Sequence, residues 1–177
     1  MDGALRGQCF PEEKHPPGLR RAISGTDLRL QCRFKVAPQG QIGISVGGPN
    51  PIVDKEFNVA GLHIRADGIT AWDNDVLYPK GSPEAAELKA KGIWNRKFFY
   101  AKIEKLPIAP DGWPTIVLEL RGKELQVMLN GKLALTYSTL CGDVTKSDIG
   151  LQSGGKSQNP VASWFDDIRV EEPEPDH

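Results

Sequence analysis

Residues 116–137 read IVLELRGKELQVMLNGKLALTY, and this stretch decides the fold class. Apolar and polar side chains alternate through it in three runs, which is the two-residue period of a β-strand with one buried face. Asn130-Gly131 separates the second run from the third and favours a type I′ turn, because that turn needs positive φ at both central residues. A Gly-Lys pair separates the first run from the second. We therefore predict a three-stranded antiparallel meander over residues 113–137.

The same period recurs elsewhere in the chain. Residues 27–36 place five apolar side chains on one face and four polar side chains on the other, namely Arg29, Gln31, Arg33 and Lys35. Similar runs cover residues 42–46, 62–66, 147–153 and 163–170. About a dozen such short strands, separated by turn residues, favour an all-β sandwich.

One segment breaks the β pattern. Residues 82–84, Ser-Pro-Glu, combine an N-cap, a proline at the first helical position and an acid in the first turn. Glu87 and Lys91 form an i,i+4 pair, and Gly92 can end the helix. We predict a short surface helix inside a long insertion, residues 73–110.

Composition and charge exclude several classes of protein. The 22 basic and 23 acidic residues give a net charge of −1, which argues against a nucleic-acid binder. No apolar run is long enough to insert into a membrane. The first seven residues, MDGALRG, lack the basic and apolar regions of a signal peptide. This predicts either a cytosolic protein or a chain that starts inside a longer secreted one.

The three cysteines, Cys9, Cys32 and Cys141, do not have the spacing of a metal site. Cys32 falls on the apolar face of its predicted strand. We therefore expect a buried thiol there that packs as a small apolar side chain.

Several stretches resemble the strands of concanavalin A-like jelly rolls, in the order that this family has them. They are DGALRG at 2–7, GWPTIVLEL at 112–120, KELQVMLNGK at 123–132, DIGLQSG at 148–154 and WFDDIRV at 164–170. The most similar families are the laminin G-like modules and the 3-keto-disaccharide hydrolase domain family.

The resemblance implies an all-β, concanavalin A-like jelly-roll β-sandwich of two antiparallel sheets with one short surface helix. We expect one domain over residues 1–170 and an acidic, proline-containing tail at 171–177. An edge strand that usually precedes the first motif in the family is expected to lie outside this chain.

The resemblance implies a carbohydrate-binding, non-catalytic module of a larger secreted bacterial protein, located outside the cell or in the cell envelope. Two strands differ from the hydrolase family: residues 41–46 read QIGISV and residues 61–67 read GLHIRAD, without the asparagine and acids of that family. Paired carboxylates on one strand, as in glycosidases, are also absent. We therefore assign no catalytic residue. The alternatives are a glycoside-active enzyme of the 3-keto-disaccharide hydrolase type and a structural or protein-interaction module.

The candidate ligand-binding residues are polar side chains on outward strand faces and two tryptophans: Arg33, His63, Arg65, Trp72 and Trp94. We expect Trp72 to end the strand that turns back from His63 and Arg65, and Trp94 in the insertion to close one side. Donors on a rigid sheet beside an aromatic ring suit a ligand rich in hydroxyl groups. The alternative is a solvated strand face with tryptophans that cover the core. His63 has two interpretations, a general base or a surface residue.

Two clusters of oxygen ligands, residues 73–75 and the pair Asp166 and Asp167, raise the question of a metal. Phe165 and Ile168 have opposite parity, so the buried face of their strand must switch near this pair. A plain β-bulge is the favoured explanation. The alternative is a structural calcium bound by Asp166 and Asp167. No other cofactor is expected.

Overall fold

The computed structural model describes residues 4–9, 18–50, 53, 57–93, 95–104, 112–139, 145–155 and 161–172. These residues form twelve strands and one helix: β1 (Leu5–Cys9), β2 (Gly18–Gly25), β3 (Leu28–Val36), β4 (Gly40–Pro49), β5 (Phe57–Arg65), β6 (Gly68–Val76), α1 (Pro83–Ala90), β7 (Arg96–Glu104), β8 (Thr115–Arg121), β9 (Glu124–Leu129), β10 (Lys132–Ser138), β11 (Lys146–Gly155) and β12 (Val161–Glu171).

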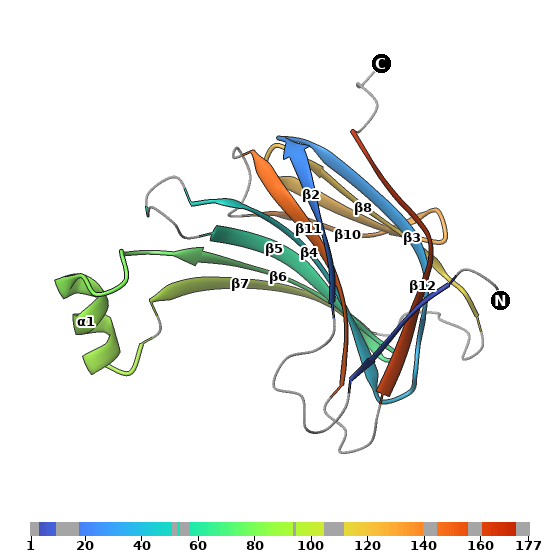
Figure 1. Ribbon diagram of the computed structural model, residues 1–177, viewed down its shortest axis with the longest axis horizontal. Helices are drawn as coiled ribbons and strands as arrows, with labels where there is room; N and C mark the ends of the chain where they lie inside the picture. Colours follow the sequence, from blue (N-terminus) through green and yellow to red (C-terminus); the bar gives the residue numbers. More distant parts are fainter. Residues whose placement is uncertain are drawn as a thin grey trace.

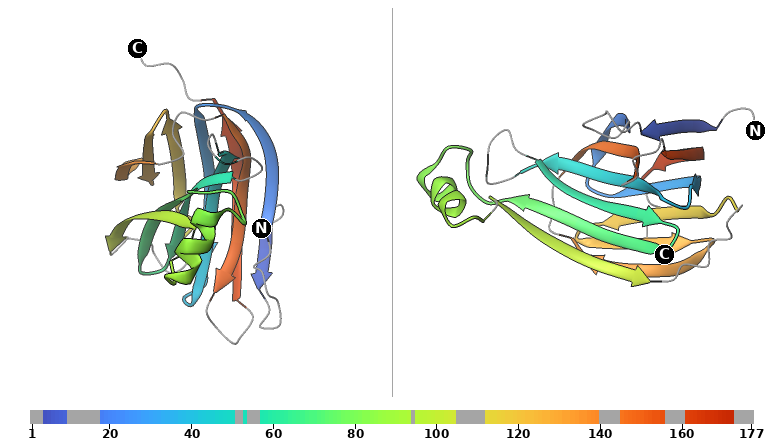
Figure 2. Two further views of the ribbon diagram at one scale, coloured as in Figure 1. Left: turned by 90° about the vertical axis from the view of Figure 1, so that its left-hand side faces the viewer. Right: turned by 90° about the horizontal axis from the view of Figure 1, so that it is seen from below.

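The strands form two six-stranded antiparallel sheets that pack face to face (Figure 1). Sheet A has the order β1-β12-β3-β8-β9-β10, and sheet B has the order β2-β11-β4-β5-β6-β7. The views of Figure 2 show the two layers and the curvature of the long strands of sheet B. This architecture confirms the predicted jelly-roll sandwich.

The core lies between the two sheets. Along β3, buried and half-buried residues alternate without a break, so one face of the strand is in the core and the other faces outward. Leu30, Cys32 and Phe34 are fully buried, as are Ile42 and Ile44 on the facing strand β4. The thiol of Cys32 is free, and burial raises its pKa to about 12. The expectation of a buried thiol is confirmed.

The meander that decided the fold class is present as β8, β9 and β10. Asn130 and Gly131 have φ values of 50° and 75°, as a type I′ turn requires. The side-chain oxygen of Asn130 also accepts a hydrogen bond from the backbone N–H of Thr115, at 3.0 Å. This hydrogen bond therefore ties the turn between β9 and β10 to the start of β8.

Two strands were missed by the sequence analysis, β2 and β7. The residues of β2 read GLRRAISG and are mostly exposed, so they show no alternation between apolar and polar side chains. The residues of β7 read RKFFYAKIE, where three aromatic residues in succession hide the period. The predicted insertion 73–110 is therefore wrong in extent. β6 continues to Val76, and β7 occupies a second part of that range.

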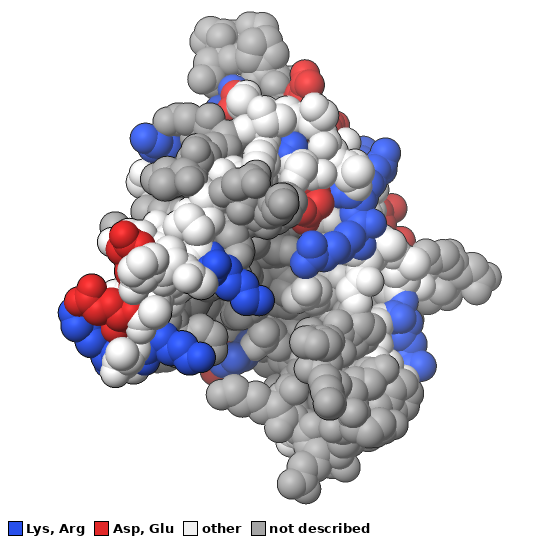
Figure 3. Space-filling view, turned by 60° about the vertical axis from the view of Figure 1, so that its left-hand side comes forward, with Lys and Arg blue, Asp and Glu red and all other residues white. Residues whose placement is uncertain are grey.

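Helix α1 connects β6 to β7 and is capped as the sequence predicts. Ser82 accepts a hydrogen bond from the backbone N–H of Ala85, and Lys91 binds Glu87 at 2.6 Å. No residue of the helix is buried, and it lies beyond the ends of the strands (Figure 1). Acidic and basic side chains are mixed over this end of the molecule (Figure 3). No helix in the described ranges is long and apolar enough to cross a membrane.

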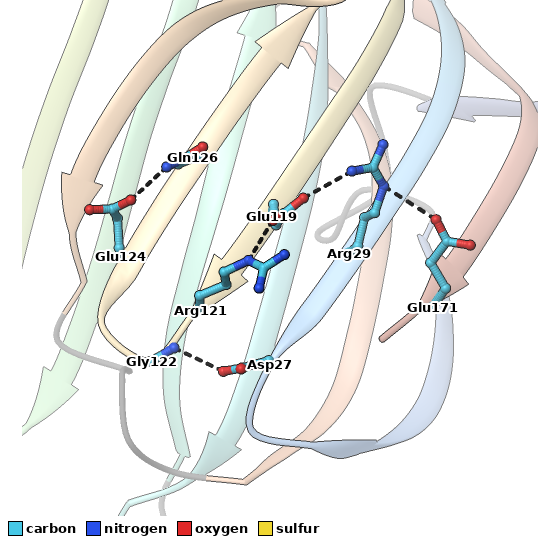
Figure 4. A network of polar contacts seen from close by, with 8 residues as sticks. All are labelled: Asp27, Arg29, Glu119, Arg121, Gly122, Glu124, Gln126 and Glu171. Carbon is cyan, nitrogen blue, oxygen red and sulfur yellow. Dashed lines mark hydrogen bonds and ion pairs between the residues drawn. The ribbon is translucent and has the colours of Figure 1, made fainter. Parts of the chain in front are cut away.

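The outer face of sheet A carries a network of ion pairs (Figure 4). Arg29 contacts Glu119 at 2.9 Å and Glu171 at 3.2 Å, and Arg121 contacts the same Glu119 at 2.7 Å. These pairs cross three neighbouring strands, β12, β3 and β8. The charges of this part of sheet A therefore neutralise one another.

Candidate functional site

The outer face of sheet B is unusual because several of its central positions are glycines, and neighbouring side chains cover the backbone there. Glycines stand at outward positions of three adjacent strands, at Gly43 and Gly47 on β4, Gly61 on β5 and Gly150 on β11. Ser45 lies between Gly61 and Gly150 in the strand register. We call this surface, with the side chains that border it, the glycine face. Side chains of neighbouring strands can lie flat against the backbone of these glycines, because glycine has no Cβ atom.

Trp72 lies directly on this bare backbone. A Cβ atom at residue 61 would lie 2.7 Å from Cζ2 of Trp72 and 2.8 Å from the backbone oxygen of Ile44. Only a glycine therefore leaves room for the indole ring. Tyr137, from the core side of sheet A, donates a hydrogen bond to the backbone oxygen of Trp72 at 3.4 Å. Trp72 sits within β6 and does not end it, which corrects the predicted strand boundary.

His63 lies beside Trp72 on the same face. The two ring centroids are 5.4 Å apart, with the rings tilted by 37°. Burial lowers the pKa of His63 below its ordinary value of 6.5, and the positive charge of Arg65 lowers it further. The imidazole is therefore neutral at pH 7 and can both donate and accept a hydrogen bond.

Polar side chains border the glycine face on its other side. Gln152 on β11 lies against Gly43, where a Cβ atom would be 3.3 Å from its side-chain oxygen. Asp148, on the same strand, lies in the same way against Gly47, and Arg20 of β2 contacts Asp148 at 3.7 Å. The glycine face thus has an aromatic ring at one side and amide, carboxylate and guanidinium groups at the other.

Arg65 lies at the end of the glycine face. Its Nε and Nη2 atoms donate hydrogen bonds to the side-chain oxygen of Gln41, at 2.8 and 2.6 Å. Gln41 is directly opposite Arg65 in neighbouring strands, because Ile42 pairs with Ile64. The structure therefore places His63, Arg65 and Trp72 on the same face of sheet B, with His63 between the other two along the hairpin. Their role in binding a ligand stays a prediction.

Arg33 is not part of this surface, and its predicted place there is wrong. β3 belongs to sheet A, so an outward side chain on β3 points away from sheet B. The guanidinium of Arg33 lies 5.6 Å from the ring centroid of Trp113 and contacts Asp166 and Asp167 at 3.8 and 3.4 Å. The sequence shows that a side chain points outward but does not show on which sheet. Trp94 lies outside the described residues.

The Asp166 and Asp167 pair lies at a β-bulge. The register between β12 and β3 shifts after Asp166, and Asp167 has a φ of 49°. The favoured explanation of the switch in the buried face is confirmed. Within the described ranges, no three His, Cys, Asp or Glu residues gather as metal ligands. Calcium at Asp166 and Asp167 stays a prediction.

The shift in the pKa of His63 predicts how stability depends on pH. Unfolded His63 takes up a proton near pH 6.5, whereas the folded protein takes it up only at lower pH. We expect the contribution of His63 to the free energy of unfolding to be constant above pH 6.5. It should fall as the pH decreases below 6.5. Urea unfolding on both sides of pH 6.5 measures this, and His63→Gln should remove that part of the dependence. Equal pH dependence in both proteins would contradict the assignment.

Sequence reasoning missed four polar residues that border the glycine face: Arg20, Ser45, Asp148 and Gln152. Three of them stand next but one to a glycine in β4 or β11, where the sequence reads GISVG and DIGLQSG. On the outward face of these strands glycines alternate with polar residues, so part of that face has no side chains. That pattern could have indicated a surface open to a ligand.

Solved structures with the same architecture include enzymes and lectins. Sheep galectin-11 in complex with glycerol has a TM-score of 0.57 at 9% identity, over 89% of this chain and 100% of the galectin. A glycoside hydrolase family 16 endo-glucanase from Bacteroides ovatus has a TM-score of 0.62 at 10% identity, over 95% of this chain and 80% of the endo-glucanase. The kappa-carrageenase from Pseudoalteromonas carrageenovora was solved with an oligotetrasaccharide of kappa-carrageenan. It has a TM-score of 0.64 at 8% identity, over 96% of this chain and 80% of the carrageenase. At these identities the likeness concerns the fold.

No curated protein matches this sequence. The family model of the 3-keto-alpha-glucoside-1,2-lyase-like domain, in contrast, matches residues 2–171. This match covers nearly the whole chain and agrees with the two-sheet architecture. The chain therefore belongs to the family of 3-keto-alpha-glucoside-1,2-lyase-like domains.

Proposed function

We propose that this protein binds a carbohydrate on the glycine face, with Trp72 as the surface on which a sugar ring stacks. The position of the Trp72 indole on the backbone of Gly61 carries this proposal. A ring fixed in this way offers a rigid apolar surface, and stacking on it costs little conformational entropy. Gln152, Asp148 and Arg20 supply donors and acceptors for hydroxyl groups.

Other proteins with the same fold support this proposal. The solved structures of the galectin and the carrageenase contain glycerol and an oligosaccharide, both of which are rich in hydroxyl groups. The binding of such ligands is expected to be weak for one site, because polar contacts with a sugar replace contacts with water. We also propose that the protein is a module of a larger secreted bacterial protein and acts outside the cell or in the cell envelope.

Calorimetric titration with a panel of glycans tests this proposal. Trp72→Ala should reduce affinity about tenfold or more, because the stacking surface is lost. Arg65→Ala should have a smaller effect, since Arg65 already binds Gln41. Trp113→Ala is the matched control, because Trp113 lies on the outer face of sheet A beside Arg33. Wild-type protein that binds no glycan, or equal affinity in all variants, would favour a structural module instead.

A second candidate function is cleavage of a 3-keto-glycoside, and two observations favour it. The family model is that of a lyase-like domain, and His63 offers a neutral imidazole on the glycine face. A neutral imidazole is the form that can remove a proton as a general base. Incubation with 3-keto-glycosides separates the two functions. Turnover that is lost in His63→Gln supports an enzyme, and binding without turnover supports the non-catalytic module.

A further inference from the structure

A cleft of about 290 Å³ continues the glycine face at one end of sheet B. It lies between two turns, around the start of β4 and the end of β5, and is lined by residues 38–41 and 65–67. Arg65 stands next but one to His63 on β5, so both side chains are on the outward face of the strand. A ligand on the glycine face can therefore extend directly into this cleft.

The cleft lies beyond the reach of a single sugar ring that stacks on Trp72. Trp72 is opposite Gly61 in the register of β5 and β6, and Arg65 is further along β5. At about 3.3 Å per residue in a strand, the backbone positions of Gly61 and Arg65 are about 13 Å apart. Only a ligand of more than one sugar unit, running along β5, can occupy both places.

Arg65 brings a positive charge to the cleft that no acid neutralises. Its Nε and Nη2 atoms both donate hydrogen bonds to the side-chain oxygen of Gln41, at 2.8 and 2.6 Å, and this acceptor is a neutral amide. Arg65 makes no other hydrogen bond or ion pair with the described residues. Gln41 thus holds one edge of the guanidinium, and the N–H groups at its other edge, on Nη1 and Nη2, remain for an anion.

The acids near this surface leave the charge of Arg65 unmatched. Asp148, at the far side of the glycine face, contacts Arg20 at 3.7 Å. Asp67 is exposed at the rim of the cleft and, in the described part of the chain, makes no ion pair with Arg65. His63 adds no charge at pH 7, because burial and the charge of Arg65 lower its pKa. An anion bonded directly to the guanidinium is attracted at close range, whereas water screens it from Asp67.

We propose that this cleft binds the carboxylate of an acidic sugar, so that the preferred ligand of the glycine face is an oligosaccharide that contains a uronic acid. The two oxygens of a carboxylate match two parallel N–H groups at one edge of a guanidinium. Another unit of the same oligosaccharide stacks on Trp72. Gln41 is a positioning residue here, because it holds Arg65 in place without cancelling its charge. This inference rests on the proposed function, since it assigns a class of ligand to the same surface.

Calorimetric titration with matched pairs of ligands tests the inference. Oligosaccharides of galacturonic, glucuronic, mannuronic and guluronic acid are each compared with their methyl esters, which keep the sugar and remove the charge. We expect at least one acid to bind about fivefold or more tightly than its ester. This preference should decrease at high salt. Trp72→Ala should weaken the binding of acid and ester alike, because stacking does not depend on the carboxylate.

Gln41→Glu is the sharpest variant, because it keeps the size of the side chain and gives Arg65 a carboxylate partner. The preference for the acid over its ester should disappear, although Arg65 is still present. Arg65→Gln should give the same result. Asp67→Asn should strengthen the binding of the acid, since it removes a negative charge from the rim of the cleft. Gln31→Glu is the matched control, because it makes the same change on the outer face of sheet A, and it should leave the preference intact.

The outcomes separate this inference from the proposed function. Equal binding of every acid and its ester, or binding of neutral glycans alone, would overturn the inference and leave the proposed function standing. A preference that survives both Gln41→Glu and Arg65→Gln, or that Gln31→Glu removes equally, would also overturn it. If the protein binds no glycan of either kind, both fail. Circular dichroism of each variant shows that a change in affinity does not come from unfolding.

Discussion

Gly61→Ala is expected to destabilise the protein by about 1–3 kcal/mol and to abolish glycan binding on the glycine face. The new Cβ atom would lie 2.8 Å from the backbone oxygen of Ile44, which cannot move without disturbing β4. It would also lie 2.7 Å from the Trp72 ring, so the indole must leave its place beside His63. Urea unfolding measures the loss of stability, and tryptophan fluorescence and calorimetric titration measure the other two effects.

Gly43→Ala is the matched control for this change. Gly43 lies on the same face, but a Cβ atom there would be 3.3 Å from the side-chain oxygen of Gln152 and 3.9 Å from the His63 ring. Both neighbours are side chains that can turn aside. We therefore expect a clearly smaller loss of stability and an unchanged tryptophan spectrum. Similar losses in both variants would show that Trp72 does not depend on the bare backbone of Gly61.

Leu118→Ala is expected to cost about 2–5 kcal/mol of stability, because it leaves a cavity between the two sheets. Leu118 is fully buried and lies opposite Leu30 and Val127 in the neighbouring strands. Chemical denaturation measures the free energy of unfolding, and the slope with denaturant should stay the same.

Leu133→Ala removes the same side chain at a surface position. Leu133 is 63% exposed on the edge strand β10, so its loss should change the stability by no more than about 0.5 kcal/mol. The loss of stability in Glu119→Ala should lie between those of Leu118→Ala and Leu133→Ala. Glu119 points outward, but it binds Arg29 and Arg121. If Leu118→Ala lowered the free energy of unfolding no more than Leu133→Ala does, this would contradict the burial of Leu118 between the two sheets.

Strands with one buried face could be predicted from the sequence, and the reason is physical. In β3 and β9 each core residue is followed by an outward one, so burial itself produces the alternating pattern. β2 could not be found in this way, because both of its faces are largely exposed. The turn at Asn130-Gly131 and the cap at Ser82 were predictable because local geometry alone selects those residues.

The candidate site was predictable only in part. His63, Arg65 and Trp72 lie close in the sequence, and a hairpin between β5 and β6 brings them together. Arg20, Asp148 and Gln152 come from distant parts of the chain, and only the strand order β2-β11-β4 brings them to the glycine face. Arg33 was misplaced for the same reason. A period of two distinguishes inside from outside, but it carries no information about which sheet a strand joins.

β12 emerges from the ribosome after every other described strand, yet it lies between β1 and β3 in sheet A. Until it is synthesised, β1 has no neighbour in the sheet, and β3 has β8 on one side only. The nascent chain therefore carries unpaired strand edges and an uncovered core through most of its synthesis. Strand pairing over such sequence separations is slow, and exposed edges of this kind aggregate. Chaperones that shield strand edges should therefore matter most for this protein before β12 has left the ribosome.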